Sequence, residues 1–323
     1  MKTKTTLFLL SISVLLLSCN SVCRKPGTGA LPHSGTITIS GAYALSPMVK
    51  VWISEYQKTH PAVKFILTPN GTGGGLKDIL AGKVDLAMIS EEVPQGTDTL
   101  LWIVPVARLG VVPVISAKNP YLKEFQENGI SRDNLVDLFS GTNPKTWGEL
   151  AGKPKKDPVK VYLRGDTSGA TTVFSRYLWL DKGELKGTPI RGEDKLLEEV
   201  KNNPLAITYC NFIYTIDPKN KVFLDDLKVL PINFKGKGRL EGKSKIFDSF
   251  EHLQRAMWLG KFPCSLVRNL YLVSKGQPKT KEMVDFIYWV VTDGQKIVPD
   301  NGYIELHSSE VQYLVNAMKE MQQ

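Results

Sequence analysis

The sequence is poor in the residues on which metal sites and nucleophilic enzymes depend. It has 4 cysteines and 4 histidines among 323 residues, and the zinc patterns CxxC and HExxH do not occur. The phosphate-loop pattern GxxxxGK[ST] and the hydrolase pattern GxSxG are also absent. We therefore predict that the protein carries no metal and no cofactor and that it is not an enzyme.

Dense stretches of positive charge are lacking as well. The net charge is +9, but the surplus is spread along the chain and no basic stripe is interleaved with aromatic residues, so we expect no nucleic-acid partner. A basic surface of this kind raises the local concentration of anions without selecting among them. Hydrophobic residues make up 42% of the chain, which is enough for packed cores, and 323 residues suggest two domains.

The apolar run near the start, Leu7–Leu17, is too short to span a bilayer of about 30 Å. It follows a short basic start, which predicts that residues 1–19 are a secretory signal peptide. The segment Leu16-Leu17-Ser18-Cys19 resembles the lipobox of bacterial lipoproteins, so we predict a lipid on Cys19 that anchors the protein to a membrane. We predict that residues 20–34 are a flexible tether. Ordinary signal-peptide cleavage with a soluble product is the alternative.

Two cysteines lie in the predicted folded body. Cys210 is in an apolar run and Cys264 follows a proline. A disulfide between them is possible in an oxidising compartment, but their spacing does not establish it. Small buried hydrophobic residues are the other interpretation.

The first part of the body predicts a parallel sheet with helical crossovers. Residues 35–40, 63–67 and 84–89 have the patterns of strands. A helical pattern that starts at Pro47, and a second one after the glycine-rich turn Asn70–Gly75, connect these strands. Ligands of such sheets gather beyond the carboxyl ends of the strands.

Later segments continue the alternation of strands and helices. Residues 104–115 form one or two strands, and a helix is predicted at 131–139. The remaining predicted elements are strands at 159–163, 205–210 and 269–273, and helices at 173–178, 278–292 and 308–321.

Two loops that join a strand to a helix carry groups suited to anions. The glycines of Asn70–Gly75 let the backbone approach a ligand, and the helix N-terminus and the Thr72 hydroxyl add donors. The loop Arg164–Ala170 offers a guanidinium, a hydroxyl and amides, and Asp166 can hold the guanidinium in place. Each loop taken alone could be a plain turn or a surface ion pair. Together they favour an anion site in a cleft.

Several motifs occur in a fixed order along almost the whole body. They are Gly41–Pro47 with Trp52, Gly71–Lys77, Val84–Ser90, Arg164–Ala170, Asn269–Lys275 and Thr292–Lys296. In this order and spacing they resemble the phosphate-binding proteins of the high-affinity phosphate ABC transporter. The resemblance implies an α/β fold of the type II periplasmic-binding-protein class, in which two α/β lobes are joined by a two-crossing hinge with the ligand cleft between them. It implies a first lobe of residues 35–112 and 262–323 and a second lobe of residues 113–261.

The resemblance also implies which residues bind the ligand. They are Tyr43, Ala44, Thr72, Ser90, Arg164, Ser168 and the amides of Gly169 and Ala170, with Asp166 behind Arg164.

The chain departs from the family at three of these positions. Tyr43 and Ala170 stand where the family usually has Ser or Thr, and Ser90 stands where some members have Asp. Phosphate keeps a proton near neutral pH and needs an acceptor for it, which Ser90, Asp166 or Glu91 would have to supply. Sulfate needs no such acceptor, so the choice of anion stays open.

The resemblance implies an extracytoplasmic, lipid-anchored receptor that captures inorganic phosphate for an ABC transporter permease, and we expect it to be a monomer. The alternatives are a binder of sulfate or another tetrahedral oxyanion, a membrane-anchored phosphate sensor without a transport role, and a serine-type phosphatase. Residues 231–241 resemble a calcium-loop-like insertion of the family. Lysines replace the acidic ligands there, so we expect an exposed basic loop without calcium.

Overall fold

The computed structural model describes residues 35–93, 98–143, 145–166, 168–217, 219–234, 240 and 244–320. The predicted signal peptide, Cys19 and the tether lie outside the described residues, as do residues 235–239 and 241–243 around the predicted basic loop. Within the described part, none of the helices combines the length and the apolar character needed to cross a membrane.

The N-terminal elements follow the predicted alternation of strands and helices. They are β1 (Thr36–Gly41), α1 (Ser46–Gln57), β2 (Lys64–Pro69), α2 (Thr72–Leu80) and β3 (Leu86–Ile89). The three strands are parallel, with β1 in the middle, which confirms the predicted parallel arrangement. Pro47 lies in the first turn of α1, where its missing amide hydrogen is not needed.

In the rest of the chain, two strands run through the middle of the main sheet, and the other strands and helices lie around them. The larger elements are β4 (Leu101–Ser116), α3 (Leu122–Asn128), α4 (Arg132–Ser140), α5 (Trp147–Ala151), β6 (Lys160–Arg164), α6 (Gly169–Leu178), β7 (Thr188–Ile190), α7 (Glu193–Asn202), β8 (Ala206–Asn211), β11 (Leu227–Val229), α8 (Phe250–Trp258), β13 (Val267–Lys275), α9 (Lys281–Val291) and α10 (Ser308–Glu320). The two-residue strands are β5 (Ile130–Ser131), β9 (Ile216–Asp217), β10 (Val222–Phe223) and β12 (Ile232–Asn233).

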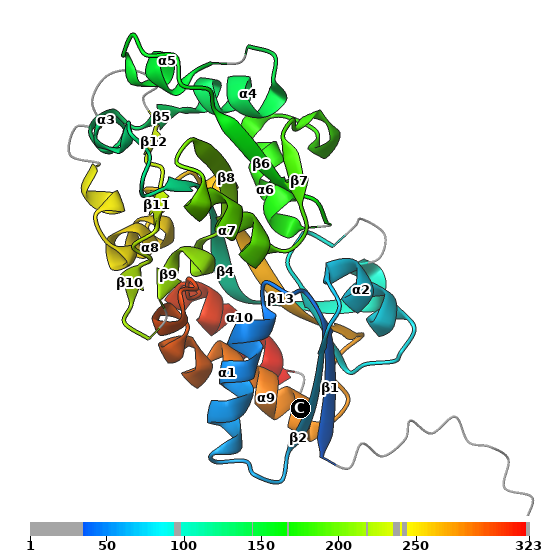
Figure 1. Ribbon diagram of the computed structural model, residues 1–323. Coiled ribbons are helices and arrows are strands. Elements are labelled where there is room, and N and C mark those ends of the chain that lie inside the picture. Colours follow the sequence, from blue (N-terminus) through cyan, green and yellow to red (C-terminus); the bar gives the residue numbers. More distant parts are fainter. Residues whose placement is uncertain are drawn as a thin grey trace, which may run out of the picture. The chain divides into compact units, whose positions relative to one another are not determined.

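One long strand joins the two parts of the main sheet. β4 pairs antiparallel with β13 along Leu101–Gly110 and then with β8 along Val111–Ile115. The apolar run at 104–115 is therefore a single strand. The sheet order is β2-β1-β3-β13-β4-β8-β6-β7, with β11 also beside β4. Figure 1 shows β4 and β13 passing between the elements around β1 and those around β6.

The two ends of the described chain pack together on the β1 side of the molecule. Helix α9 packs beside α1 and α10. The fully buried Trp52 donates from Nε1 to the Gly294 carbonyl over 3.0 Å, and the Gln295 amide donates to the Val106 carbonyl over 2.9 Å. These contacts support a first lobe built from both chain ends, while the limits of the two lobes stay a prediction.

Aromatic packing fixes the start of α6 over β8. The rings of Phe174 and Tyr209 are stacked with centroids 4.4 Å apart, and Phe139 packs edge-on against Phe174. The hydroxyls of Thr171 and Tyr209 lie 2.9 Å apart. The first turn of α6 is thereby held at the end of the sheet where β6 terminates.

The two cysteines of the body do not form a disulfide. Cys210 is buried and Cys264 is exposed, and both are free. Cys210 packs in the core as a small hydrophobic residue, and burial raises the pKa of its thiol well above the usual value.

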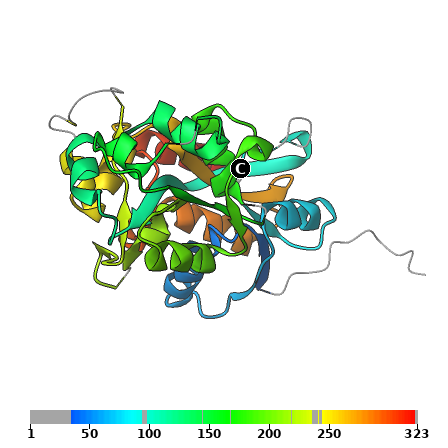
Figure 2. The same cartoon turned by 45° about the horizontal axis from the view of Figure 1, so that its top comes forward.

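The glycine-rich segment is helical where the sequence predicted a turn. Helix α2 begins at Thr72, and only Gly71 before it has a positive φ, of 83°. A Cβ placed on Gly75 would lie 2.6 Å from the Cα of Gly41. The glycines therefore let the first turn of α2 lie directly against the end of β1, where both views show it (Figures 1 and 2). A side chain at position 75 would push the helix off the strand.

This close approach predicts the effect of two matched substitutions. We expect Gly75→Ala to lower the free energy of unfolding by about 1–3 kcal/mol, because the new methyl group overlaps the backbone of β1. Gly73→Ala is the control, since its Cβ would meet nothing within 4 Å and alanine favours a helix by about 0.5–1 kcal/mol. Urea denaturation measures both. Equal effects of the two variants would contradict the packing argument.

Candidate functional site

A cavity of about 630 Å³ lies beyond the carboxyl ends of β1, β3 and β6, and we call it the site cavity. Ligands of α/β sheets bind at this position. Seven of the eight ligand residues predicted from the sequence line it. They are Tyr43, Ala44, Thr72, Ser90, Arg164, Ser168 and Gly169. Thr72 and Arg164, which come from distant parts of the chain, therefore border the same space.

Four helices begin at the site cavity. Residues at or just before the first turns of α1, α2, α6 and α7 line it. The first amides of a helix have no acceptor within the helix, and the helix dipole adds partial positive charge at the same end. Four such ends around one cavity make a setting that suits an anion.

Thr72 and Ser90 are held in contact with each other. Their hydroxyl oxygens lie 3.0 Å apart, and the Ser90 amide donates to the Thr72 Oγ1 over 3.2 Å. Ser90 is 4% exposed. The start of α2 and the end of β3 thus present two hydroxyl groups to the cavity in a fixed orientation.

Arg164 is held by two carboxylates. Its Nε and Nη2 donate to the two carboxylate oxygens of Asp166 over 2.8 and 2.9 Å, and its Nη1 donates to Glu193 over 2.8 Å. The bond to Arg164 lowers the pKa of Asp166, whereas burial raises the pKa of Glu193. The predicted bracing of Arg164 by Asp166 is therefore present, with Glu193 as a second brace.

The sequence interpretation missed a buried polar chain behind Arg164. Glu193 accepts from the backbone amide of Asn211 over 2.7 Å and from its side-chain amide over 2.9 Å. The Asn211 oxygen in turn accepts from Nη2 of Arg268 over 2.7 Å. A charged residue at position 268 in a strand that is otherwise largely apolar is the one sequence signal that could have pointed to this chain.

Two predicted residues differ from their expected setting. Ala170 is fully buried and does not line the site cavity, because its side chain packs in the core and its amide donates to the Ser168 hydroxyl over 3.2 Å. Ser168 is the N-cap of α6, and its side chain accepts from the Ala170 amide, which the family resemblance had assigned to the ligand. Tyr43 lines the cavity, but its side chain is largely exposed, so it lies at the cavity mouth.

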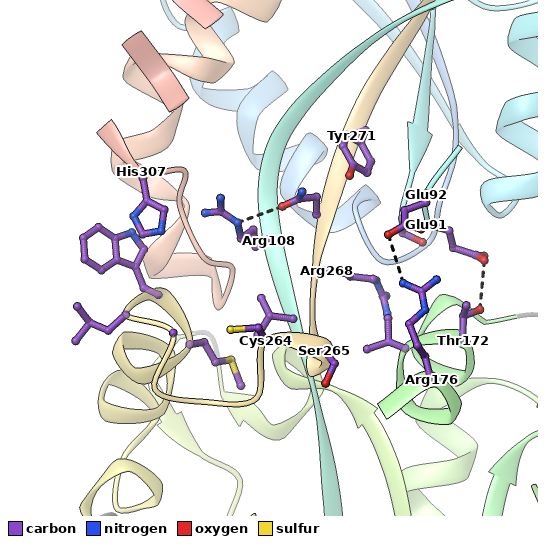
Figure 3. A pocket seen from close by; sticks show the side chains of 18 residues that line it. Glu91, Glu92, Arg108, Thr172, Arg176, Cys264, Ser265, Arg268, Tyr271 and His307 are labelled. Atoms are coloured by element: carbon purple, nitrogen blue, oxygen red, sulfur yellow. Dashed lines mark hydrogen bonds and ion pairs between the residues drawn. The ribbon is translucent and has the colours of Figure 1, made fainter. Parts of the chain in front are cut away.

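A second cavity of about 640 Å³ shares Ser90, Glu91 and Arg268 with the site cavity. Figure 3 shows its side chains along β4 and β13. Arg108 lines the second cavity but not the site cavity, and it donates to the side chains of Asn269 and Glu310. Arg176, which also lines the second cavity, pairs with Glu92 over 3.4 Å, so both arginines of this cavity other than Arg268 contact a carboxylate.

Among the residues that the structure describes, no group of three His, Cys, Asp or Glu side chains is arranged to hold a metal ion.

Comparison with known proteins gives the family. The PBP superfamily domain matches residues 26–294. The chain belongs to the PBP, or periplasmic binding protein, superfamily. This match and the similarity to a solved structure of a substrate-binding protein confirm the predicted fold class, two α/β lobes with a cleft between them.

Relatives of this PBP chain carry names that refer to phosphate. The phosphate-binding protein PstS of Bacillus subtilis is 26% identical over 324 residues, which is 96% of each chain. PstS of Methanocaldococcus jannaschii is 25% identical and covers 91% of this chain and 88% of its own. The crystal structure of a putative phosphate ABC transporter substrate-binding protein from Clostridium perfringens, with bound phosphate, aligns with a TM-score of 0.67 at 20% identity, over 84% of this chain and 100% of its own. The similarity inferred from the motifs is confirmed.

The Arg164–Asp166 pair of this PBP predicts how stability depends on pH. Because the folded-state pKa of Asp166 is lowered, the pair adds stability above the unfolded pKa of about 3.9 and loses it as the pH falls through the folded value. The side chain is 37% exposed, so we expect Asp166→Asn to lower the free energy of unfolding at about pH 7 by only about 1 kcal/mol or less. The difference from wild type should shrink toward about pH 3.

Urea denaturation across this pH range measures the difference. Asp300→Asn is the control, because Asp300 pairs with Lys221 at the surface, away from the site cavity. A gap between wild type and Asp166→Asn that stays constant from neutral to acid pH would show that the ionised pair is not its source.

Proposed function

We propose that the chain is an extracytoplasmic phosphate-binding protein that delivers inorganic phosphate to an ABC transporter permease. The observation that carries the proposal is the convergence of Arg164, the Thr72 and Ser90 hydroxyls and four helix N-termini on one cavity in a PBP fold. The names of the relatives, which refer to phosphate binding and to a phosphate ABC transporter, support it. These relatives are binding proteins, in agreement with the prediction that the chain is not an enzyme.

The proposed ligand contacts follow from the cavity. Arg164 donates hydrogen bonds through the guanidinium hydrogens that Asp166 and Glu193 leave unused. Thr72 and Ser168 donate hydrogen bonds through their hydroxyl groups. The first-turn amides of α2 and the amide of Gly169 add neutral donors. Ser168 can serve the ligand only by rotating its hydroxyl hydrogen, because its oxygen already accepts from Ala170.

The proton of phosphate needs an acceptor at this site. Both oxygens of Asp166 already accept from Arg164, which leaves Ser90 and Glu91. Glu91 accepts from the Thr172 hydroxyl through Oε2 over 3.2 Å, so its other oxygen is the one that can face the ligand. We assign the acceptor role to Ser90 and Glu91 together. The Ser in place of Asp at position 90 keeps sulfate as the second candidate ligand.

We also propose that the protein is anchored to a bacterial membrane through a lipid on Cys19 and acts as a monomer. The motif Leu16–Cys19 supports the anchor. The tether of residues 20–34 would let the body move between the membrane surface and a permease. A phosphate sensor without a transport role would share the anchor and the site and would differ only in lacking a permease partner.

Titration calorimetry with phosphate tests the site. We expect 1:1 binding by wild type and at least about 100-fold weaker binding by Arg164→Ala, because the charge-assisted bonds to the anion, each worth about 1.5–3 kcal/mol, are lost. Arg191→Ala is the control, since Arg191 is exposed and does not line the cavity. Its affinity should equal that of wild type.

The same titration separates the candidate ligands. Tight binding of phosphate with weak binding of sulfate supports a phosphate receptor, and the reverse order assigns the site to sulfate. Unchanged affinity of a folded Arg164→Ala protein would remove Arg164 from the site. Hydrolysis of a phosphomonoester by wild type would point to the phosphatase instead.

Membrane fractionation of cells that express the full chain tests the anchor. Cys19→Ser should move the protein from the membrane fraction to the soluble one, because serine lacks the thiol that takes the lipid. Cys23→Ser, four residues further on, is the matched control and should stay with the membrane. Retention of the Cys19→Ser protein in membranes would rule out this attachment site.

A further inference from the structure

Arg268 is a second guanidinium at the site cavity, and the ligand set implied by the sequence does not include it. It lies on β13 and is 9% exposed. Its Nη2 donates to Asn211, whereas its Nε and Nη1 are buried and have no hydrogen-bond partner among the described residues. Two donors of a charged group are therefore left unused inside the protein.

An unused buried donor is costly and calls for an explanation. Leaving one such donor without an acceptor costs about 1–3 kcal/mol, and more for a charged group. Burial also lowers the pKa of Arg268 to about 10, which is the direction expected for a cation short of acceptors. An acceptor that arrives with a ligand would remove this penalty.

The position of Arg268 fits such a ligand. It borders both the site cavity and the second cavity. A Cβ on Gly169 would lie 3.4 Å from Arg268 Cζ and 3.0 Å from the Ser90 hydroxyl oxygen. The guanidinium therefore lies against Gly169, which also packs against Ser90, and the absence of a side chain at Gly169 is what makes this close packing possible.

The charge balance singles out Arg268 among its neighbours. Arg164 contacts two carboxylates, Arg108 contacts Glu310, and Arg176 lies 3.4 Å from Glu92. Figure 3 shows Arg108 and Arg268 on opposite sides of the β4–β13 pair, in accord with the alternation of side chains along a strand. Within the described part of the chain, no ion pair joins Arg268 to a carboxylate.

We propose that Arg268 is a second guanidinium ligand for the bound oxyanion. Its Nε and Nη1, which the protein covers in this structure, donate to an oxygen of the anion beside Gly169 once the side chain shifts toward the cavity, while Nη2 stays on Asn211. With this contact, the guanidinium groups of Arg164 on β6 and Arg268 on β13 both face the ligand. The ligand class is therefore a tetrahedral oxyanion with two negative charges. The inference rests on the proposed anion-binding function and adds a residue to that site.

Two measurements on the same variants test this role. Calorimetry with phosphate should show that Arg268→Met binds about 10-fold to 100-fold more weakly than wild type, the loss that goes with a hydrogen bond to a charged group. Thermal unfolding without phosphate should show a smaller fall in Tm than Arg108→Met gives, because methionine removes a buried charge with two unpartnered donors and keeps the volume, while only the Asn211 oxygen loses a donor. Arg268→Lys, which keeps the charge but not the planar fork, should lose about 10-fold in affinity.

Arg108→Met is the matched control, on the neighbouring strand and outside the site cavity. It should leave the affinity for phosphate unchanged and lower the Tm, because Glu310 loses its cation. Wild-type affinity in both variants of Arg268 would overturn the inference and leave the proposed function standing. A Tm of Arg268→Met that falls as far as that of Arg108→Met would show a structural role and overturn it as well. A wild-type protein that binds neither phosphate nor sulfate would remove the proposed function, and the inference with it.

Discussion

The ion pair between Glu193 and Arg164 holds the candidate site together. Glu193 is buried in the first turn of α7, and it bonds at once to Arg164 at the end of β6 and to Asn211 at the end of β8. A buried carboxylate is expensive unless its oxygens are fully used, and here each oxygen of Glu193 accepts a hydrogen bond. The pair therefore fixes two strand ends and one helix start relative to each other. The orientation of the guanidinium toward the cavity follows from that arrangement.

Close backbone packing has the same effect on the other side of the cavity. The first turn of α2 can lie on the end of β1 only because Gly41 and Gly75 carry no side chains. The Gly41 carbonyl accepts from the amides of Asn70 and Gly71, which fixes the loop just before the helix. The first turn of α2, which lines the cavity through Thr72, Gly73 and Gly74, is thereby held in place by main-chain contacts. Glycine at these positions therefore determines where the start of α2 lies relative to β1.

The parts of this arrangement that depend on local sequence could be predicted, and the parts that depend on packing between distant segments could not. The strands around Ile39 and Leu163 and the loops that follow them are visible in the alternation of apolar residues and in the glycines. The start of α2 at Thr72 was missed, because a run of glycines has a low helix propensity and only the contact with β1 makes it helical. Glu193, Asn211 and Arg268 were missed for a related reason, since their roles arise where three separate segments meet. The elements and their connecting loops were predictable from the sequence, whereas the buried polar partners of the site residues were not.

The charges on the cavity wall indicate that the proposed anion recognition depends on the direction of hydrogen-bond donors more than on formal charge. Four carboxylates line the cavity, those of Glu91, Asp166, Glu193 and Asp194, against the two guanidinium groups of Arg164 and Arg268. A site judged by formal charge alone would attract a cation. Three of the carboxylates, however, accept hydrogen bonds from the protein itself, from Arg164, Asn211 and Thr172. Asp166 and Glu193 use both carboxylate oxygens in such bonds and Glu91 uses one, whereas the starts of four helices and two guanidinium groups also border the cavity. Hydrogen bonds from these donors gain strength where the local dielectric is low. Discrimination among anions then depends on whether each ligand oxygen meets a donor and each ligand proton meets an acceptor. The overall charge of +9 has no part in that discrimination.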